Sequence, residues 1–90
     1  MNQRTVSAYV LRALAQAQIE GTVSTLATLT SELRVRKGDV RAAVSALHRE
    51  GYLDALRMRL TLRGFAVGSA LIGEELPELR PARVAVRAAA

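Results

Sequence analysis

The stretch RVRKGDVRAAVSALHREGYLD, residues 34–54, decides how the chain folds, because it contains a complete amphipathic helix and the glycine that ends it. Its apolar residues recur at three- and four-residue spacing, which places them on one face of an α-helix. They are Val40, Ala43, Val44 and Leu47. The pattern predicts a helix over residues 37–50 that ends at Gly51.

Cations occupy the side of this predicted helix that points away from the core. At about 100° per residue, four positions lie roughly 100° to 180° away from the buried position of Val40. They are Gly38, Arg41, Ser45 and Arg49. The helix that the core requires therefore also presents a basic face to solvent.

The net charge of +5 is concentrated in the middle third of the 90-residue chain. Residues 34–63 contain eight basic and three acidic side chains, whereas the rest of the chain contains five of each sign. Such a local excess of one sign is typical of a surface that binds a polyanion. A basic surface that is merely solvated is the alternative interpretation.

Two further helices are predicted before this stretch. Apolar residues at helical spacing predict the first over residues 5–20, with Thr5 as its N-cap. The segment GTVS, residues 21–24, is expected to end that helix at its glycine and to continue as a short extended strand. A second helix is expected to begin at Ser24 or Thr25. Its predicted buried residues are Leu26, Leu29 and Leu33.

After the quoted stretch the apolar period changes from helical to two-residue. Between residues 56 and 63 apolar and polar residues alternate strictly, which predicts a half-buried strand in a two-stranded ribbon, or wing. The expected inward residues are Leu56, Met58, Leu60 and Leu62. Thr61 is also the expected N-cap of a fourth helix over residues 62–72, although Gly64 and Gly68 are poor helix formers.

These elements predict a mainly α fold with a small β-ribbon, in the order helix, strand, helix, helix, short wing, helix. Residues 1–73 form the predicted domain. Pro77 and Pro81 exclude a continuous helix beyond it. Residues 74–90 are therefore expected to be a tail, either disordered or forming an edge strand in a dimer.

That element order is the order of a winged helix-turn-helix domain, and the sequence resembles MarR-like and related bacterial winged-helix transcription factors. In those proteins the second helix carries L-A-x-x-L, where this chain reads LATLT from Leu26, with threonine at the last position. Their recognition helix ends L-x-x-x-G-[LY]-[LIV], matched by LHREGYL from Leu47, and L-T-x-x-G follows the wing, matched by LTLRG from Leu60. This chain has a shorter wing and lacks their long flanking dimerisation helices.

The resemblance implies duplex DNA as the partner, with the third helix in the major groove. Arg36 and Lys37 then reach phosphates or the first base edge, although the helix dipole disfavours cations at that end. Gly38 permits close approach of the DNA backbone. Arg41 is the expected base reader, because a guanidinium can bond guanine O6 and N7 together.

The remaining predicted DNA contacts come from the end of the third helix and from the wing. Ser45 is expected to bond a base or a phosphate, and Arg49 a phosphate. Arg57 and Arg59 are the expected wing cations on the DNA backbone, where Arg63 can also reach. The alternative for Arg57 and Arg59 is that outward strand positions face water in any case.

The sequence predicts a protein that is not an enzyme and has no cofactor, metal or small-molecule ligand. With no cysteine and one histidine, His48, a metal site would need carboxylate clusters that the sequence lacks. The hydroxyl-rich second helix is accompanied by no base and orienting acid. No apolar run reaches the roughly 20 residues of a membrane span, and no signal-peptide pattern is present. We therefore expect a bacterial, cytoplasmic, nucleoid-associated protein that does not contact membrane.

Two functions fit this reading. The first is a sequence-specific double-stranded DNA-binding protein acting as a small transcriptional regulator. It is expected to be a homodimer, because one helix in one groove binds weakly. A non-specific architectural DNA binder would differ from it only in specificity. The alternative is a winged-helix protein-protein interaction module, an adaptor or anti-repressor, that binds an acidic partner surface, since one fold serves both uses.

Overall fold

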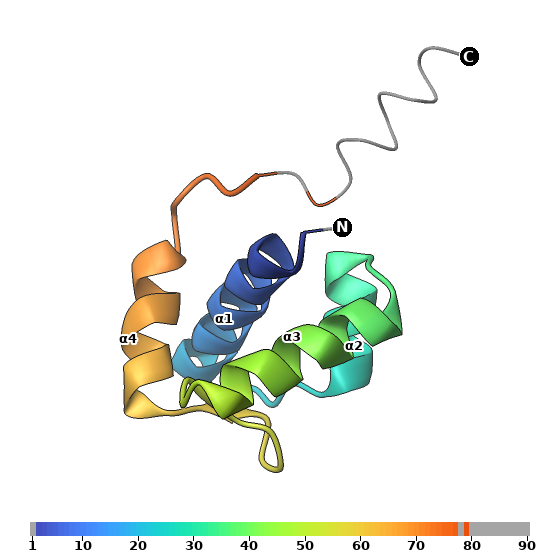
Figure 1. The fold of residues 1–90 in the computed structure, drawn as a ribbon. Helices are drawn as coiled ribbons and strands as arrows, with labels where there is room; N and C mark the ends of the chain where they lie inside the picture. Colours follow the sequence, from blue (N-terminus) through green and yellow to red (C-terminus); the bar gives the residue numbers. More distant parts are fainter. Residues whose placement is uncertain (1, 78, 80–90) are drawn as a thin grey trace, which may run out of the picture.

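The computed structural model describes residues 2–77 and 79 (Figure 1). This part of the chain forms four helices and one two-stranded hairpin. In chain order they are α1 (Gln3–Glu20), α2 (Leu26–Leu33), α3 (Lys37–Arg49), β1 (Leu53–Asp54), β2 (Arg59–Leu60) and α4 (Leu62–Leu71). A mainly helical domain with a short hairpin after its third helix is consistent with a winged-helix-like arrangement.

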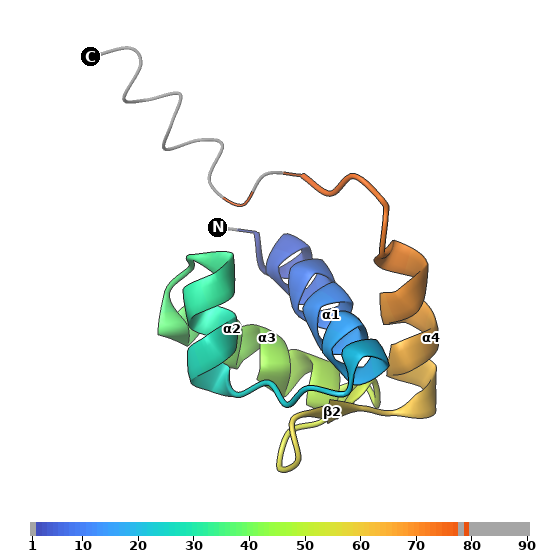
Figure 2. The ribbon, with the colours of Figure 1, turned by 180° about the vertical axis from the view of Figure 1, so that it is seen from behind.

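The first helix forms the centre of the domain. It packs against α4 on one side and against α3 and α2 on the other (Figures 1 and 2). Its N-cap is Asn2, whose side-chain oxygen accepts the N–H of Arg4 at 2.8 Å, so the predicted N-cap at Thr5 is wrong by three residues. Gly21 ends the helix with φ +75°, as predicted.

The second helix begins at a capping threonine and ends in a short turn that joins it to α3. Thr25 is the N-cap of α2, as predicted, and exchanges hydrogen bonds with Thr28: each hydroxyl accepts the other residue's N–H, at 3.1 and 2.7 Å. Arg34 then reverses the chain with φ +57°, a left-handed conformation that is costly for a residue with a Cβ atom. Val35 is buried beneath this turn.

The third helix matches its prediction closely. It runs over Lys37–Arg49, and the predicted apolar stripe of Val40, Ala43, Val44 and Leu47 is buried. Gly51 follows with φ +84°, and the N–H of Tyr52 bonds the carbonyl of Leu47 at 2.9 Å. The helix is therefore held to the domain by one face only.

The strand predicted between the first two helices is not formed. Residues 22–25 carry no regular secondary structure, and in the described part of the chain β2 pairs only with β1. The outer edge of β2 is bonded instead by a side chain, because the amide oxygen of Gln18 accepts the N–H of Leu60 at 2.7 Å. One glutamine thus occupies the place of a neighbouring strand.

The strand predicted over residues 56–63 is also wrong in its extent. The hairpin is two residues long on each side, with Leu53 opposite Leu60 and Asp54 opposite Arg59. Met58 has φ +52°, which ends the extended conformation and breaks the alternation of faces. Of the four residues expected to point inward, only Leu60 is buried. Leu56 and Leu62 are 95% and 88% exposed.

The fourth helix begins where it was predicted. Thr61 is its N-cap and accepts the N–H of Gly64 at 3.1 Å, while its hydroxyl donates to the carbonyl of Gly51 at 2.7 Å. The two helical glycines are sites of close packing. A Cβ atom on Gly64 would overlap the carbonyl of Tyr52, and one on Gly68 would lie 2.5 Å from the carbonyl oxygen of Leu11.

Beyond α4 the chain returns along the first half of α1. The hydroxyl of Tyr9 donates to the carbonyl of Pro77 at 2.7 Å, and Arg12 donates to the carbonyl of Glu74 at 3.2 Å. The guanidinium of Arg12 also stacks on the ring of Tyr9, 4.9 Å from its centroid. The remainder of the predicted tail, residues 78 and 80–90, lies outside the described residues.

Candidate nucleic-acid interface

The outer face of α3 carries the predicted contact residues together. Gly38, Arg41, Ser45 and Arg49 succeed one another at three- or four-residue spacing, so they form one row along the helix. All four are exposed. The row lies opposite the buried stripe of α3, and α1 packs on the buried side. The structure therefore leaves this row open to a partner.

Two cations stand at the N-terminus of α3, where they work against the helix dipole. Arg36 is the N-cap and makes no side-chain capping bond, and Lys37 is the first helical residue. Each such cation costs about 0.3–1 kcal/mol at this end. Asp39 is the acidic residue of the first turn and offsets part of that cost. Folding gains nothing evident from this placement.

Within the described residues, the cations of α3 have no ion-pair partner. Among residues 2–77 and 79, the ion pair found is the one between Arg57 and Asp54, with an Nε–Oδ2 distance of 3.8 Å. No charged group in that part of the chain bonds the side chains of Arg36, Lys37, Arg41 or Arg49. These groups keep their full charge for an external anion.

The hairpin turn is ordered by Asp54. One carboxylate oxygen of Asp54 accepts the N–H groups of Leu56 and Arg57, at 3.1 and 3.4 Å. A carboxylate that bonds the backbone two and three residues later stabilises a tight turn. The turn spans residues 55–58 and projects beyond the body of the domain (Figure 1).

His48 attaches the hairpin to α3, a role that the sequence did not indicate. Its Nδ1 atom lies 3.0 Å from the carbonyl oxygen of Leu53 and 3.2 Å from the N–H of Ala55. According to its tautomer, Nδ1 donates to the first or accepts from the second. Either bond links the end of α3 to the hairpin, so the two predicted contact regions are held beside each other.

The two wing cations differ in their surroundings. Arg57 is 79% exposed in its side chain and makes the long contact with Asp54, which at such exposure contributes little to stability. Arg59 lies in β2 and is exposed. Both side chains point into solvent from the hairpin that His48 ties to α3.

Arg63 has a partner within the domain. Its guanidinium stacks on the ring of Tyr52, 4.5 Å from the centroid, and donates to the Tyr52 hydroxyl at 3.3 Å. It also donates to the carbonyl of Glu50 at 3.4 Å. Arg63 therefore joins the start of α4 to the end of α3 and is less available to DNA than the sequence suggested.

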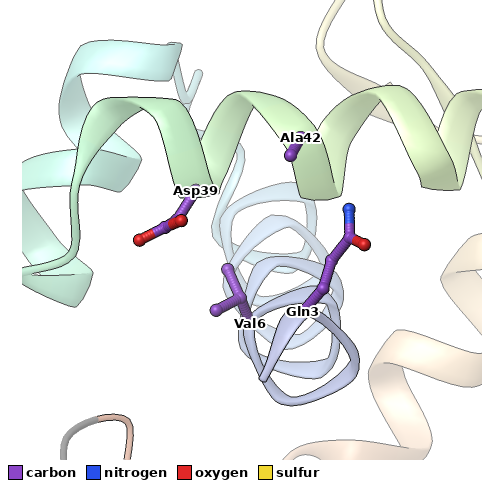
Figure 3. Close-up of a pocket in the computed structure, with 4 residues that line it drawn as sticks. All are labelled: Gln3, Val6, Asp39 and Ala42. Atoms are coloured by element: carbon purple, nitrogen blue, oxygen red, sulfur yellow. The ribbon is translucent and has the colours of Figure 1, made fainter. Parts of the chain in front are cut away.

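A hollow lies beside α3, on the flank that faces the start of α1. Gln3 and Val6 line it from α1, and Asp39 and Ala42 line it from α3 (Figure 3). Among the described residues that line it, the one charged group is the carboxylate of Asp39. The carboxylate of Asp39 gives this hollow a charge opposite to that of the basic row of α3, so the hollow does not extend the basic surface of the candidate interface.

Metal-binding clusters and membrane-spanning helices are both absent from the described residues. Across the described residues, no group of three or more histidine, aspartate or glutamate side chains is placed to hold a metal ion. Over the same residues, no helix has both the length and the apolarity needed to cross a membrane.

The comparisons add no relative. No protein-family model, no curated protein and no solved structure matches this chain.

Proposed function

We propose that the chain is a sequence-specific duplex-DNA-binding protein that acts as a small transcriptional regulator. In this proposal α3 enters the major groove and presents Arg41 and Ser45 to base edges. Arg36, Lys37 and Arg49 contact phosphates, and the hairpin lays Arg57 and Arg59 on the neighbouring backbone. The winged-helix resemblance of the sequence supports the same docking.

The observation that carries the proposal is the set of cations on α3 that folding does not use. Two of them oppose the helix dipole, and within the described residues none is paired with a carboxylate. DNA carries about one negative charge per 1.7 Å of its axis. A protein gains affinity for DNA when its cations displace the condensed counterions. A polyanion therefore supplies the compensation that the fold does not.

The dimensions of α3 fit the proposed docking. Its 13 residues, at about 1.5 Å each, make a rod about 20 Å long. The major groove, about 12 Å wide, accepts one α-helix of this kind. Gly38 lies near the N-terminal end of the row, where the helix would come closest to the backbone. A Cβ atom there would meet nothing within 4 Å, so the domain itself does not require the glycine.

A homodimer is the second part of the proposal. One helix in one groove binds weakly, whereas a dimer reads two half-sites about one helical turn apart. The first half of α1 is an expected dimer surface, but residues 74–77 of the same chain already contact it through Tyr9 and Arg12. A second copy would therefore meet α1 together with this returning segment.

Selection of bound duplexes from a random pool by the purified protein tests the proposal. We expect one enriched sequence, a binding constant that falls steeply with salt, and a mass in solution of two chains. Arg41→Ala should reduce discrimination against a changed guanine by about 1–3 kcal/mol. Arg4→Ala, which removes an exposed cation from α1, is the matched control and should leave discrimination unchanged.

Absence of duplex binding at low salt would contradict the proposal. Binding that is insensitive to salt would do so as well, because the cations would then not contact phosphates. Equal effects of Arg4→Ala and Arg41→Ala would indicate a non-specific polyanion surface.

A protein-interaction module is the second candidate, and the size of the hairpin favours it. With two residues in each strand, the wing offers DNA few contacts. An acidic protein surface would pair with the α3 cations equally well and would need no wing. Co-purification of an acidic protein, whose binding Arg41→Ala weakens, together with no retardation of any duplex, would decide for this function.

A further inference from the structure

The tip of the hairpin carries an apolar side chain that the fold does not use. Leu56 is 95% exposed, although the alternation of the sequence places it with the buried Leu60. Turn positions are usually occupied by glycine, proline, asparagine, aspartate or serine. A single exposed leucine is ordinary on a protein surface. Leu56 is distinguished by its position in an ordered turn that projects from the domain (Figure 1), next to an exposed cation.

The turn holds the backbone at this residue in place. Asp54 accepts the N–H of Leu56 at 3.1 Å and the N–H of the following residue, Arg57, at 3.4 Å. The backbone of the tip is therefore held by a side chain of the first strand. An apolar side chain on a held backbone loses less freedom on binding than one on a loose loop.

Charge around Leu56 indicates the kind of partner. Arg57 follows it with 79% of its side chain exposed, and Arg59 is exposed one position beyond Met58. The nearby carboxylate of Asp54 is turned toward the backbone of the turn and toward Arg57. An apolar tip followed by two cations suits a partner with an anionic border and an apolar interior, which is the character of a DNA groove with its stacked bases.

We infer that Leu56 is an apolar wedge, which enters the minor groove next to the major-groove site and separates one base step. This inference rests on the proposed function. Two strands about 4.8 Å apart, with their side chains, are too wide for a minor groove of about 6 Å, but one side chain fits. Inserted leucines unstack a step and bend the duplex toward the major groove. Such a bend would bring more backbone toward α3.

The wedge also assigns a sequence preference. Pyrimidine–purine steps, TA and CA/TG, unstack most easily, so they should be favoured where the hairpin lands. The protein would then read one position through the deformability of DNA and not through a hydrogen bond.

The test uses the full chain and the duplex selected from the random pool, labelled at its two ends with an energy-transfer pair. The wild-type protein should raise transfer, because a bent duplex brings its ends together. Leu56→Ala should bind without raising transfer, and Leu56→Met should restore it. Leu62→Ala is the matched control, because Leu62 is 88% exposed but lies at the start of α4.

Affinity gives a second readout. On a duplex with a TA step under the hairpin, Leu56→Ala should weaken binding by about tenfold, and on one without such a step by less than about twofold. Unchanged thermal unfolding of Leu56→Ala would confirm that the fold is intact.

Two outcomes overturn the wedge alone: a wild-type complex whose duplex stays straight, and a Leu56→Ala complex that bends it as the wild type does. A change of solution mass caused by Leu56→Ala also overturns it, because Leu56 would then contact protein. If the wild-type chain binds no duplex at all, the proposed function itself fails. The first comparison with wild-type protein therefore separates the two failures.

Discussion

The helices α3 and α4 both contain glycine, but the glycines lie in opposite environments. In α4 the two glycines face inward, where a Cβ atom would collide with the backbone of Tyr52 or of Leu11. In α3, Gly38 faces outward, and a Cβ atom there would meet nothing within 4 Å. A helical glycine costs roughly 0.5–1 kcal/mol relative to alanine. In α4 this cost is offset by close packing against the neighbouring backbone. In α3 no packing contact of Gly38 with the described residues offsets it.

The largest effect should come from alanine in α4. Gly64→Ala forces a Cβ atom into the carbonyl of Tyr52, so either α4 or the end of α3 must shift. We expect a loss on the order of 3 kcal/mol in the free energy of unfolding, and about 1–3 kcal/mol for Gly68→Ala, which crowds Leu11 and Ala15. Urea unfolding measures both. Ala66→Ser, on the exposed side of α4, should change little.

Gly38→Ala should act in the opposite direction. Better helix propensity with no steric conflict should raise the free energy of unfolding by about 0.5–1 kcal/mol. If α3 approaches DNA there, the same variant should bind the selected duplex more weakly while being more stable. Urea unfolding and duplex titration on one protein sample provide the two numbers. Unchanged affinity would mean that Gly38 has no role in the interface.

The smallest effects on stability should come from the hairpin cations. Arg57→Ala and Arg59→Ala should each change the free energy of unfolding by less than about 0.5 kcal/mol, because both residues are exposed. Each should nevertheless lower the slope of log affinity against log salt by about 0.9 if its side chain contacts a phosphate. Titration at several salt concentrations measures the slope. A slope equal to that of the wild type would show that these two side chains do not contact phosphates. The phosphate contacts would then be assigned to α3.

The features that were predicted correctly are set by local sequence. The buried stripe of α3 follows from side-chain periodicity, and the caps at Thr25, Thr61 and Gly21 follow from residue type and position. The exposed row of α3 followed from the same periodicity, so its residues could be named in advance. Their contact with DNA stays a prediction.

The features that were missed depend on tertiary context. The second strand of the hairpin was predicted too long, because alternation continues through residues 56–63 while the left-handed Met58 ends the extended conformation. Asp54 was the available signal, since an aspartate before a four-residue loop favours a turn. The bond from Gln18 to the edge of β2 joins residues 42 positions apart, and no local pattern reports it. The same holds for the stacking of Arg63 on Tyr52.

Hydrogen bonds from two side chains, Gln18 at the edge of β2 and His48 at the end of α3, hold the hairpin against the helices. A wing built into a three-stranded sheet takes its direction from backbone pairing, which resists single substitutions. Here two side chains, from Gln18 and His48, replace much of that pairing. Point mutations can therefore change the direction of the hairpin while the helical core stays intact. The direction of the hairpin and the stability of the domain can thus evolve separately.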